Sequence, residues 1–211
     1  KLLSSLDGSA GSHPRDVTGG EDSPAESSLV ETDASVDVFD RITLSARVQF
    51  TVTADAVADW HVASYDRYTG DGWVRTGGTT PYAGPATPPP GETTTVEQTV
   101  RAEATARTMP AAWKPVRVVG EAAARTEVTA TGGLVPGIPF VAGDEYTVVT
   151  RVVDATPARL RAATGSVPDR IRRRYLQLPG STPERVRRKA REITADAATA
   201  YDAAAAVEEW L

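Results

Sequence analysis

The chain has 211 residues, of which 40% are hydrophobic and 24% are charged, and its formal net charge is −5. This length is enough for one or two domains with a real core, and the negative charge argues against a general nucleic-acid partner. The sequence contains no cysteine, which excludes a disulfide, a thiolate nucleophile and a cysteine-based zinc site within it. It also contains no apolar run of about 18 residues, the length that indicates a membrane-spanning helix.

The first part of the chain is acidic and polar. Residues 1–41 are rich in Ser, Gly, Asp and Glu and contain few large apolar side chains. Such a segment buries too little apolar surface to offset the entropy lost on ordering. We therefore predict that residues 1–41 form a flexible acidic tether.

A β-rich unit is predicted over residues 42–154. Apolar and polar residues alternate from Ile42 to Val52, which indicates a strand with one buried face. Short strands between Pro- and Gly-rich loops favour an antiparallel sheet or β-sandwich over a parallel sheet. Further strands are predicted at residues 60–65, 94–105, 115–119, 126–131 and 145–153.

The last part, residues 155–211, has a helical pattern, so the chain is α+β overall. Thr156-Pro157 and Thr182-Pro183 are each typical of an N-cap followed by the first helical residue. Ala200, Ala203, Val207 and Trp210 stay in helical phase to the end of the sequence, without the usual cap or breaker. We expect this apolar stripe to need a partner outside the chain, which we interpret as a segment of a longer protein.

Few residues suggest chemistry. His13 and His61 are the only histidines, and no nucleophile or metal motif accompanies them. Asp66 and Asp71 lie among glycines, but they lack the spacing and the terminal glutamate of a calcium loop. We therefore expect no catalytic, cofactor-binding or metal-binding residue in this sequence.

The densest local cluster runs from Tyr65 to Trp73. It predicts a hairpin in which Asp71-Gly72 permits a positive φ and aromatic rings clamp the two strands. An alternative is an aromatic platform for sugar, to which Trp60, Tyr82 and Trp113 would add rings.

Residues 170–191 are strongly basic. A charge run of this kind is typical of a solvated helix face, with acidic residues elsewhere in the chain as partners. The same residues could instead meet anionic lipid headgroups or an acidic partner.

Two ordered motifs stand out in the sequence. The positions that define them are Trp60, Tyr65, Asp66, Tyr68, Gly70, Gly72 and Trp73 in the first motif, then Tyr175, Leu178 and Pro179, and finally Tyr201 and Asp202. Together these motifs make a specific resemblance to TgpA-type transglutaminase-like membrane proteins. The similarity in order and spacing runs over residues 42–211, although Ala200 stands where that family commonly has proline.

This resemblance implies a place in the extracytoplasmic region that precedes a papain-like core. The chain would be a non-catalytic accessory segment on the outer face of the cytoplasmic membrane, anchored through the parent protein, with residues 155–211 leading into the core. The parent's Cys-His-Asp triad would lie beyond Leu211. The implied partners are that core, the transmembrane segments and a protein substrate of the parent.

The alternative function is a stand-alone β-sandwich module that binds carbohydrate or cell-surface ligands. It predicts that Trp60, Tyr65, Tyr68 and Trp73 lie exposed on one face. The accessory-segment hypothesis predicts that these rings are mostly buried, in a hairpin with a structural role.

Overall fold

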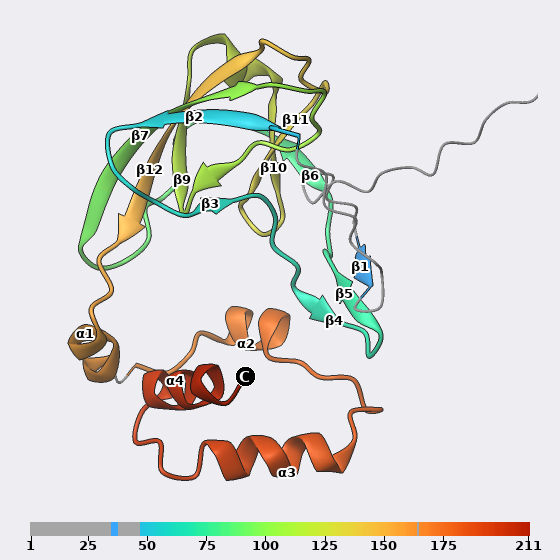
Figure 1. Cartoon of the computed structure of the whole chain (residues 1–211), viewed down its shortest axis with the longest axis vertical. Coiled ribbons are helices and arrows are strands. Elements are labelled where there is room, and N and C mark those ends of the chain that lie inside the picture. Colours follow the sequence, from blue (N-terminus) through green and yellow to red (C-terminus); the bar gives the residue numbers. More distant parts are fainter. Residues whose placement is uncertain (1–34, 38–46, 164) are drawn as a thin grey trace, which may run out of the picture.

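The computed structural model describes residues 35–37, 47–163 and 165–211 of the chain. Strands fill one end of the molecule and helices the other, and the β4–β5 hairpin lies beside α2 where the two ends meet (Figure 1). Antiparallel sheets followed by C-terminal helices confirm the predicted fold class, α+β overall. Within the described residues, no helix has the length and apolar character needed to cross a bilayer.

The largest sheet has the strand order β2-β7-β12-β9, and every pairing in it is antiparallel. Its centre is the long pair β7–β12, in register from Glu145 opposite Arg101 to Val153 opposite Thr93. Strand β7 has one buried face, because every second residue from Val96 to Ala102 is buried, as expected for the side-chain alternation of a strand. The four strands are β2 (Phe50–Ala54), β7 (Thr93–Ala102), β9 (Pro115–Val119) and β12 (Glu145–Val153).

The predicted strands at 115–119 and 145–153 are confirmed residue for residue, whereas the other two strands of this sheet differ at their ends. The strand predicted from Ile42 begins only at Phe50; residues 47–49 are not in a strand, and residues 42–46 lie outside the described residues. The strand predicted to reach residue 105 ends at Ala102, where the Ala102 N–H donates to the Asp144 carbonyl instead.

The core lies against one face of this sheet and is closed by loops and short strands. Phe140 stacks on Tyr146 with 5.2 Å between ring centroids, and the buried Tyr146 hydroxyl donates to the Pro110 carbonyl at 2.8 Å. Burial raises the pKa of Tyr146 well above its ordinary value, so this phenol remains a neutral donor. The core cluster comprises Val100, Ala102, Ala106, Met109, Ala111, Val118, Ala122, Leu134, Phe140, Tyr146 and Val148.

The described residues also form three smaller sheets, of which β3-β8 and β11-β10-β6 contribute to the core. Strand β3 is shorter than predicted, because only Trp60 and His61 pair, with Ala112 and Ala111 of β8. Strand β10 ends at Thr129, where a turn with Gly132 at φ 91° follows. These elements are β3 (Trp60–His61), β8 (Ala111–Ala112), β6 (Thr79–Pro81), β10 (Thr126–Thr129), β11 (Leu134–Pro136) and the 3-10 helix η1 (Gly120–Arg125).

The third small sheet, β1-β5-β4, contains part of the segment predicted as a tether. Strand β1 (Ser35–Asp37) pairs antiparallel with β5 (Gly72–Val74), which also pairs with β4 (Arg67–Tyr68). The rest of the predicted tether, residues 1–34 and 38–41, lies outside the described residues.

The helices follow β12. The predicted cap at Thr156 is confirmed, since its Oγ1 accepts from the Arg159 N–H at 3.4 Å. The predicted cap at Thr182 is wrong: its hydroxyl donates to the Pro179 carbonyl at 2.8 Å, and Pro183 is the residue before the helix. The helices are α1 (Pro157–Ala162), α2 (Asp169–Tyr175), α3 (Glu184–Ile193) and α4 (Ala200–Trp210).

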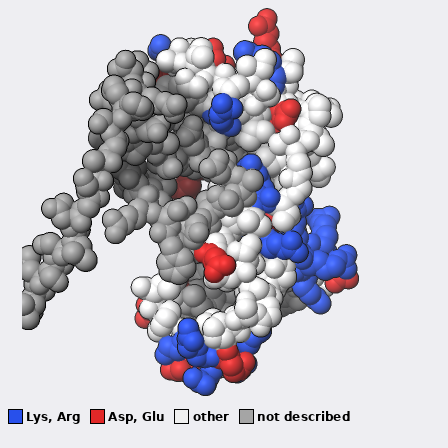
Figure 2. All heavy atoms as spheres, turned by 90° about the vertical axis from the view of Figure 1, so that its right-hand side faces the viewer, with Lys and Arg blue, Asp and Glu red and all other residues white. Residues whose placement is uncertain are grey.

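None of these helices contains a fully buried residue. Figure 2 shows that basic side chains gather at mid-height on one face, whereas at its lower end basic and acidic side chains are interspersed. The helical part is therefore held to the sheets by surface and polar contacts, some through motif residues and some through Arg159 of α1, which pairs with Glu92 and Asp154.

Candidate functional site

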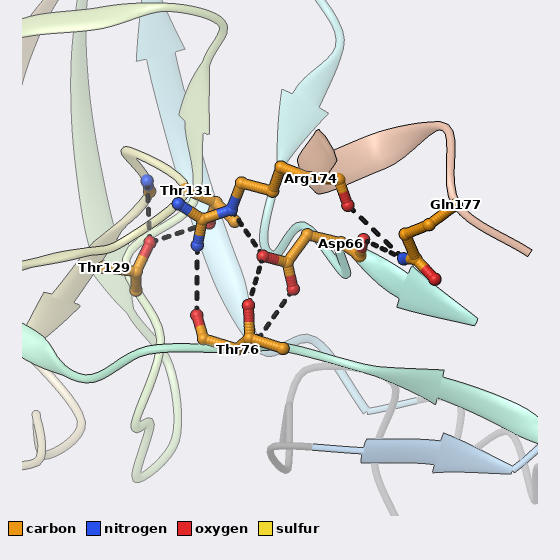
Figure 3. Close-up of polar contacts among 7 residues, drawn as sticks. Asp66, Thr76, Thr129, Thr131, Arg174 and Gln177 are labelled. Carbon is orange, nitrogen blue, oxygen red and sulfur yellow. Dashed lines mark hydrogen bonds and ion pairs between the residues drawn. The ribbon is translucent and has the colours of Figure 1, made fainter. Parts of the chain in front are cut away.

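A carboxylate at the start of the β4–β5 hairpin joins the sheet part of the molecule to the helices. Asp66 precedes β4 and is 1% exposed. Arg174 of α2 contacts this carboxylate, and its Nε donates to Asp66 Oδ2 at 2.5 Å (Figure 3). The two residues are 108 positions apart in the sequence. We call this contact, with its hydrogen-bonding partners, the Asp66–Arg174 joint.

Thr76 forms hydrogen bonds with both side chains. Its N–H donates to Asp66 Oδ1 and its hydroxyl to Asp66 Oδ2, each at 2.7 Å, and its carbonyl accepts from the Arg174 guanidinium at 3.1 Å. A buried carboxylate is costly unless its oxygens are paired and hydrogen-bonded, and here both oxygens are. The joint is therefore a satisfied polar contact within the described structure.

The surroundings of Asp66 act on its pKa in opposite directions. Burial raises the pKa, whereas the two hydrogen bonds from Thr76, together with the hydrogen bond and charge of Arg174, lower it. The net result is a pKa below the ordinary value of 3.8, so Asp66 is ionised at neutral pH. A carboxylate that is ionised at neutral pH and faces an arginine is suited to structural pairing and poorly suited to proton transfer.

The joint also brings together the first two sequence motifs. Gln177 Nε2 donates to the Asp66 carbonyl at 3.1 Å. A Cβ built on Gly70 would lie 3.9 Å from Pro179 Cγ and 3.5 Å from Ser181 Oγ. The segment containing Tyr175, Leu178 and Pro179 is thus seated against the hairpin, although Leu178 itself is 54% exposed.

The turn of the hairpin differs from the prediction. Gly70 has the positive φ, at 113°, and Gly72 does not, so the expected role of Asp71-Gly72 is wrong. The Thr69 side chain sets the turn instead, because its hydroxyl donates to the Gly72 carbonyl at 3.0 Å and its oxygen accepts from the Gly72 N–H at 3.1 Å. Tyr68 adds a bond from its hydroxyl to the Gly70 carbonyl at 2.6 Å.

The aromatic motif residues are half-buried, between the two predictions made for them. Trp60 and Trp73 are 38% and 42% exposed, so neither ring belongs to the core, and Tyr65 and Tyr68 are intermediate. Trp73 packs on Tyr68 with 5.3 Å between ring centroids. Trp60 lies in the β3–β8 sheet and Trp73 in β1-β5-β4, so the four rings do not share one sheet face.

A second joint, at Tyr201 and Asp202, holds α4 to α1. Arg161 Nε donates to Asp202 Oδ1 at 2.8 Å, and the Arg161 guanidinium lies 4.9 Å from the centroid of the Tyr201 ring. Thr199 caps α4 by accepting from the Asp202 N–H at 3.1 Å. Hydrogen bonds from Arg161 and Thr199 lower the pKa of Asp202, against the smaller opposing effect of burial.

Comparison with known proteins identifies the family of this chain. The sequence model of the TgpA N-terminal domain matches residues 14–157, which is more than half of the chain. The chain belongs to the TgpA N-terminal domain family. The match begins inside the segment predicted as a tether and ends at the first residue of α1, so the TgpA N-terminal domain model includes the hairpin but not Arg174.

A solved structure has the same fold. The periplasmic domain of TgpA from Pseudomonas aeruginosa superposes with a TM-score of 0.52 at 18% identity, covering 78% of this chain. This chain covers 55% of that domain, and so spans about half its length. A comparison with curated protein sequences returned no match.

The partners of Asp66 and Asp202 were not evident from the sequence. Arg174 and Arg161 are two of many arginines, and nothing in their spacing distinguishes them. Among the described residues, no cluster of three or more His, Asp or Glu side chains has the geometry of a metal site. In the described part of the chain, the motif residues Asp66, Tyr201 and Asp202 contact residues of the same chain.

Proposed function

We propose that this chain is a non-catalytic, extracytoplasmic accessory segment of a membrane-bound transglutaminase-like protein, in which it positions the Cys-His-Asp core. The observation that carries the proposal is the Asp66–Arg174 joint, which ties the helices leading toward the core to the hairpin. Membership of the TgpA N-terminal domain family and a fold shared with a periplasmic TgpA domain support the placement.

The helical part offers the surface on which the core would dock. Trp210 is 55% exposed, Leu211 is 91% exposed, and Val186 of α3 is 48% exposed. Helices α3 and α4 are in contact, and exposed large apolar side chains on neighbouring elements are typical of a surface that another domain covers. We expect α3 and α4 to pack on the core, and thereby to set its orientation relative to the sheet part and the membrane.

The decisive experiment extends the chain past Leu211 in its genomic reading frame and treats the product with a thiol-directed activity probe. We expect a cysteine in the extension to be labelled and residues 1–211 to remain unlabelled. An extension that contains no reactive cysteine, or a reading frame that ends at Leu211, would contradict the link to a thiol enzyme.

Hydrogen exchange tests the positioning role separately. In the extended protein, amides of α3 and α4 should exchange more slowly than in residues 1–211, because the core covers their exposed apolar faces. Amides of β12, already inside the sheet, serve as the internal control and should exchange equally in both proteins. Equal exchange of α3 in both proteins would rule out docking through this surface.

The partial exposure of Trp60 and Trp73 favours one second candidate, a stand-alone module that binds carbohydrate or cell-surface ligands. It predicts that the tryptophan fluorescence of residues 1–211 shifts saturably on titration with cell-wall oligosaccharides, and that Trp73→Ala abolishes the shift. Absence of a saturable shift would leave the accessory role as the better account.

A further inference from the structure

A basic pocket lies where the hairpin meets α2. It has a volume of about 480 Å3, and four of its eight lining residues are arginines: Arg67 of β4 and Arg170, Arg173 and Arg174 of α2. Arg67 is more than 100 positions from the others in the sequence, so the fold brings the four cations together. We call this feature the arginine pocket.

Three of these arginines lack a partner within the described structure. Arg174 is paired with Asp66, whereas Arg67, Arg170 and Arg173 make no ion pair or side-chain hydrogen bond to any described residue. Arg67, Arg170 and Arg173 are all exposed, so their guanidinium groups are accessible to a solute. The pocket thus carries positive charge that the described chain does not neutralise.

The arrangement is unfavourable for the helix itself. Arg170 is three residues from Arg173 and four from Arg174, and like charges at these spacings destabilise a helix. Helix α2 has only seven residues, so it has little intrinsic stability with which to offset that repulsion. An anion bound among the guanidinium groups would relieve it.

The unpaired pocket arginines differ from two paired cations elsewhere in the basic stretch 170–191. On α3, Lys189 pairs with Glu192 at 2.9 Å and Arg191 with Glu184 at 2.7 Å, as expected for a solvated helix face. The mixed charges at the lower end of the face in Figure 2 contrast with the basic side chains at mid-height. The predicted solvated face with acidic partners therefore describes these α3 residues, whereas on α2 the arginine with a described acidic partner is Arg174.

The chemistry of the pocket indicates the ligand. The planar guanidinium presents paired N–H donors that match phosphate oxygens, and arginine clusters are the usual phosphate-binding device in proteins. A volume of about 480 Å3 lies within the range of small-molecule sites, so it admits more than a lone ion. We propose that the arginine pocket binds the phosphate group of a phosphorylated ligand, either a soluble phosphate compound or a phospholipid headgroup.

This site would act whether or not a catalytic core follows, because every residue of the pocket belongs to residues 1–211. The test therefore uses the whole chain in two binding arms. In one arm, inorganic phosphate is titrated and amide chemical shifts are followed. In the other, the protein is sedimented with vesicles of phosphatidylcholine alone or of phosphatidylcholine and phosphatidylglycerol in a ratio of about 3:1, a composition chosen for its anionic surface.

The pocket variant is Arg170→Gln with Arg173→Gln, and the matched control is Arg187→Gln with Arg188→Gln on α3. Both change the net charge equally, and all four side chains are exposed, so each protein should melt at the wild-type temperature. We expect the pocket variant to weaken binding by about tenfold or more, since charge-assisted bonds to phosphate are lost, and the control to weaken it far less. If the double variant fails to fold, Arg67→Gln on β4 gives the same comparison.

The possible outcomes distinguish a soluble phosphate compound from a lipid headgroup, and they also show whether the proposal fails. Pocket-dependent shifts with inorganic phosphate identify a soluble phosphate compound, and pocket-dependent sedimentation without such shifts identifies a headgroup. An equal loss in the pocket and control variants would show attraction by general charge alone and overturn the proposal. So would an absence of binding in both arms.

Discussion

The sheet part and the helical part of this chain are stabilised by different forces. In residues 47–153 a continuous apolar cluster is closed off from water, whereas α1–α4 contain no buried residue. Arginine–carboxylate contacts hold these helices: the two joints, and the pairs of Arg159 in α1 with Glu92 and Asp154. Apolar burial is non-directional and insensitive to pH, but charged hydrogen bonds depend on protonation and geometry. We therefore expect the helices to separate from the sheets under conditions that leave the sheets folded.

The largest effect should come from the core of the sheet part. Met109 is 1% exposed, and Met109→Ala should lower the free energy of unfolding by roughly 2–5 kcal/mol, through lost burial and the cavity left behind. Urea unfolding followed by circular dichroism measures the change. The control is Val186→Ala on α3, 48% exposed, which should change stability by no more than about 0.5 kcal/mol. Equal losses of unfolding free energy in both variants would contradict the proposed difference between the sheet part and the helical part.

A smaller effect is expected at the Asp66–Arg174 joint. Asp66→Ala leaves the Thr76 N–H and the Arg174 guanidinium without their acceptor, at a cost of roughly 1–3 kcal/mol. Hydrogen exchange should show faster exchange in α2 and the hairpin, with β7 and β12 unchanged. Asp71→Asn is the matched control in the same hairpin, because Asp71 is exposed and its carboxylate makes no contact described here. Uniform destabilisation across the sheet would contradict a local joint.

The same joint should be sensitive to acid. Because the pKa of Asp66 is lower in the folded chain than its ordinary value of 3.8, its contribution is fully present above that value and is lost as pH falls through the folded pKa. We expect protection of α2 amides to fall on acidification below about pH 4, ahead of the β12 amides. Asp66→Asn should flatten this dependence. A wild-type and a variant profile of equal slope would assign the acid effect to other carboxylates.

The smallest effect is expected at the second joint, where the side chain of Arg161 is 53% exposed and that of Asp202 is 26% exposed. Exposed ion pairs contribute little and are screened by salt. Asp202→Asn should therefore speed amide exchange only in α1 and α4, and about 1 M NaCl should remove most of the difference from wild type. A difference that persists in high salt would show that the Thr199 cap, rather than the ion pair, holds α4 in place.

Local patterns predicted the parts of the fold that depend on neighbouring residues. The alternation in Glu145–Val153 gave a central strand with its exact ends, and the Thr156-Pro157 pair gave the start of α1. The Thr182-Pro183 pair looks identical in sequence but fails, because the Thr182 hydroxyl bonds the Pro179 carbonyl. The same two residue types thus cap one helix and close the turn before another, and only their surroundings decide which.

Long-range pairing explains what the sequence did not predict. The motifs singled out Asp66 and Tyr201-Asp202 as important positions, but not the arginines that each contacts. An ion pair across 108 residues depends on how the hairpin and α2 approach, which no periodicity encodes. The arginine pocket was missed for the same reason, since Arg67 joins the α2 arginines only in the folded chain.

The β4–β5 hairpin also has a mechanical consequence. Strand β1 pairs with one side of it through three residue pairs, and α2 is attached through Asp66, so tension applied between β1 and α2 would run along the hairpin and bypass the four-stranded sheet. Three short pairings and one ion pair would yield before the long β7–β12 register. In a single-molecule pulling experiment, the connection between β1 and α2 should release at low force while the four-stranded sheet stays intact.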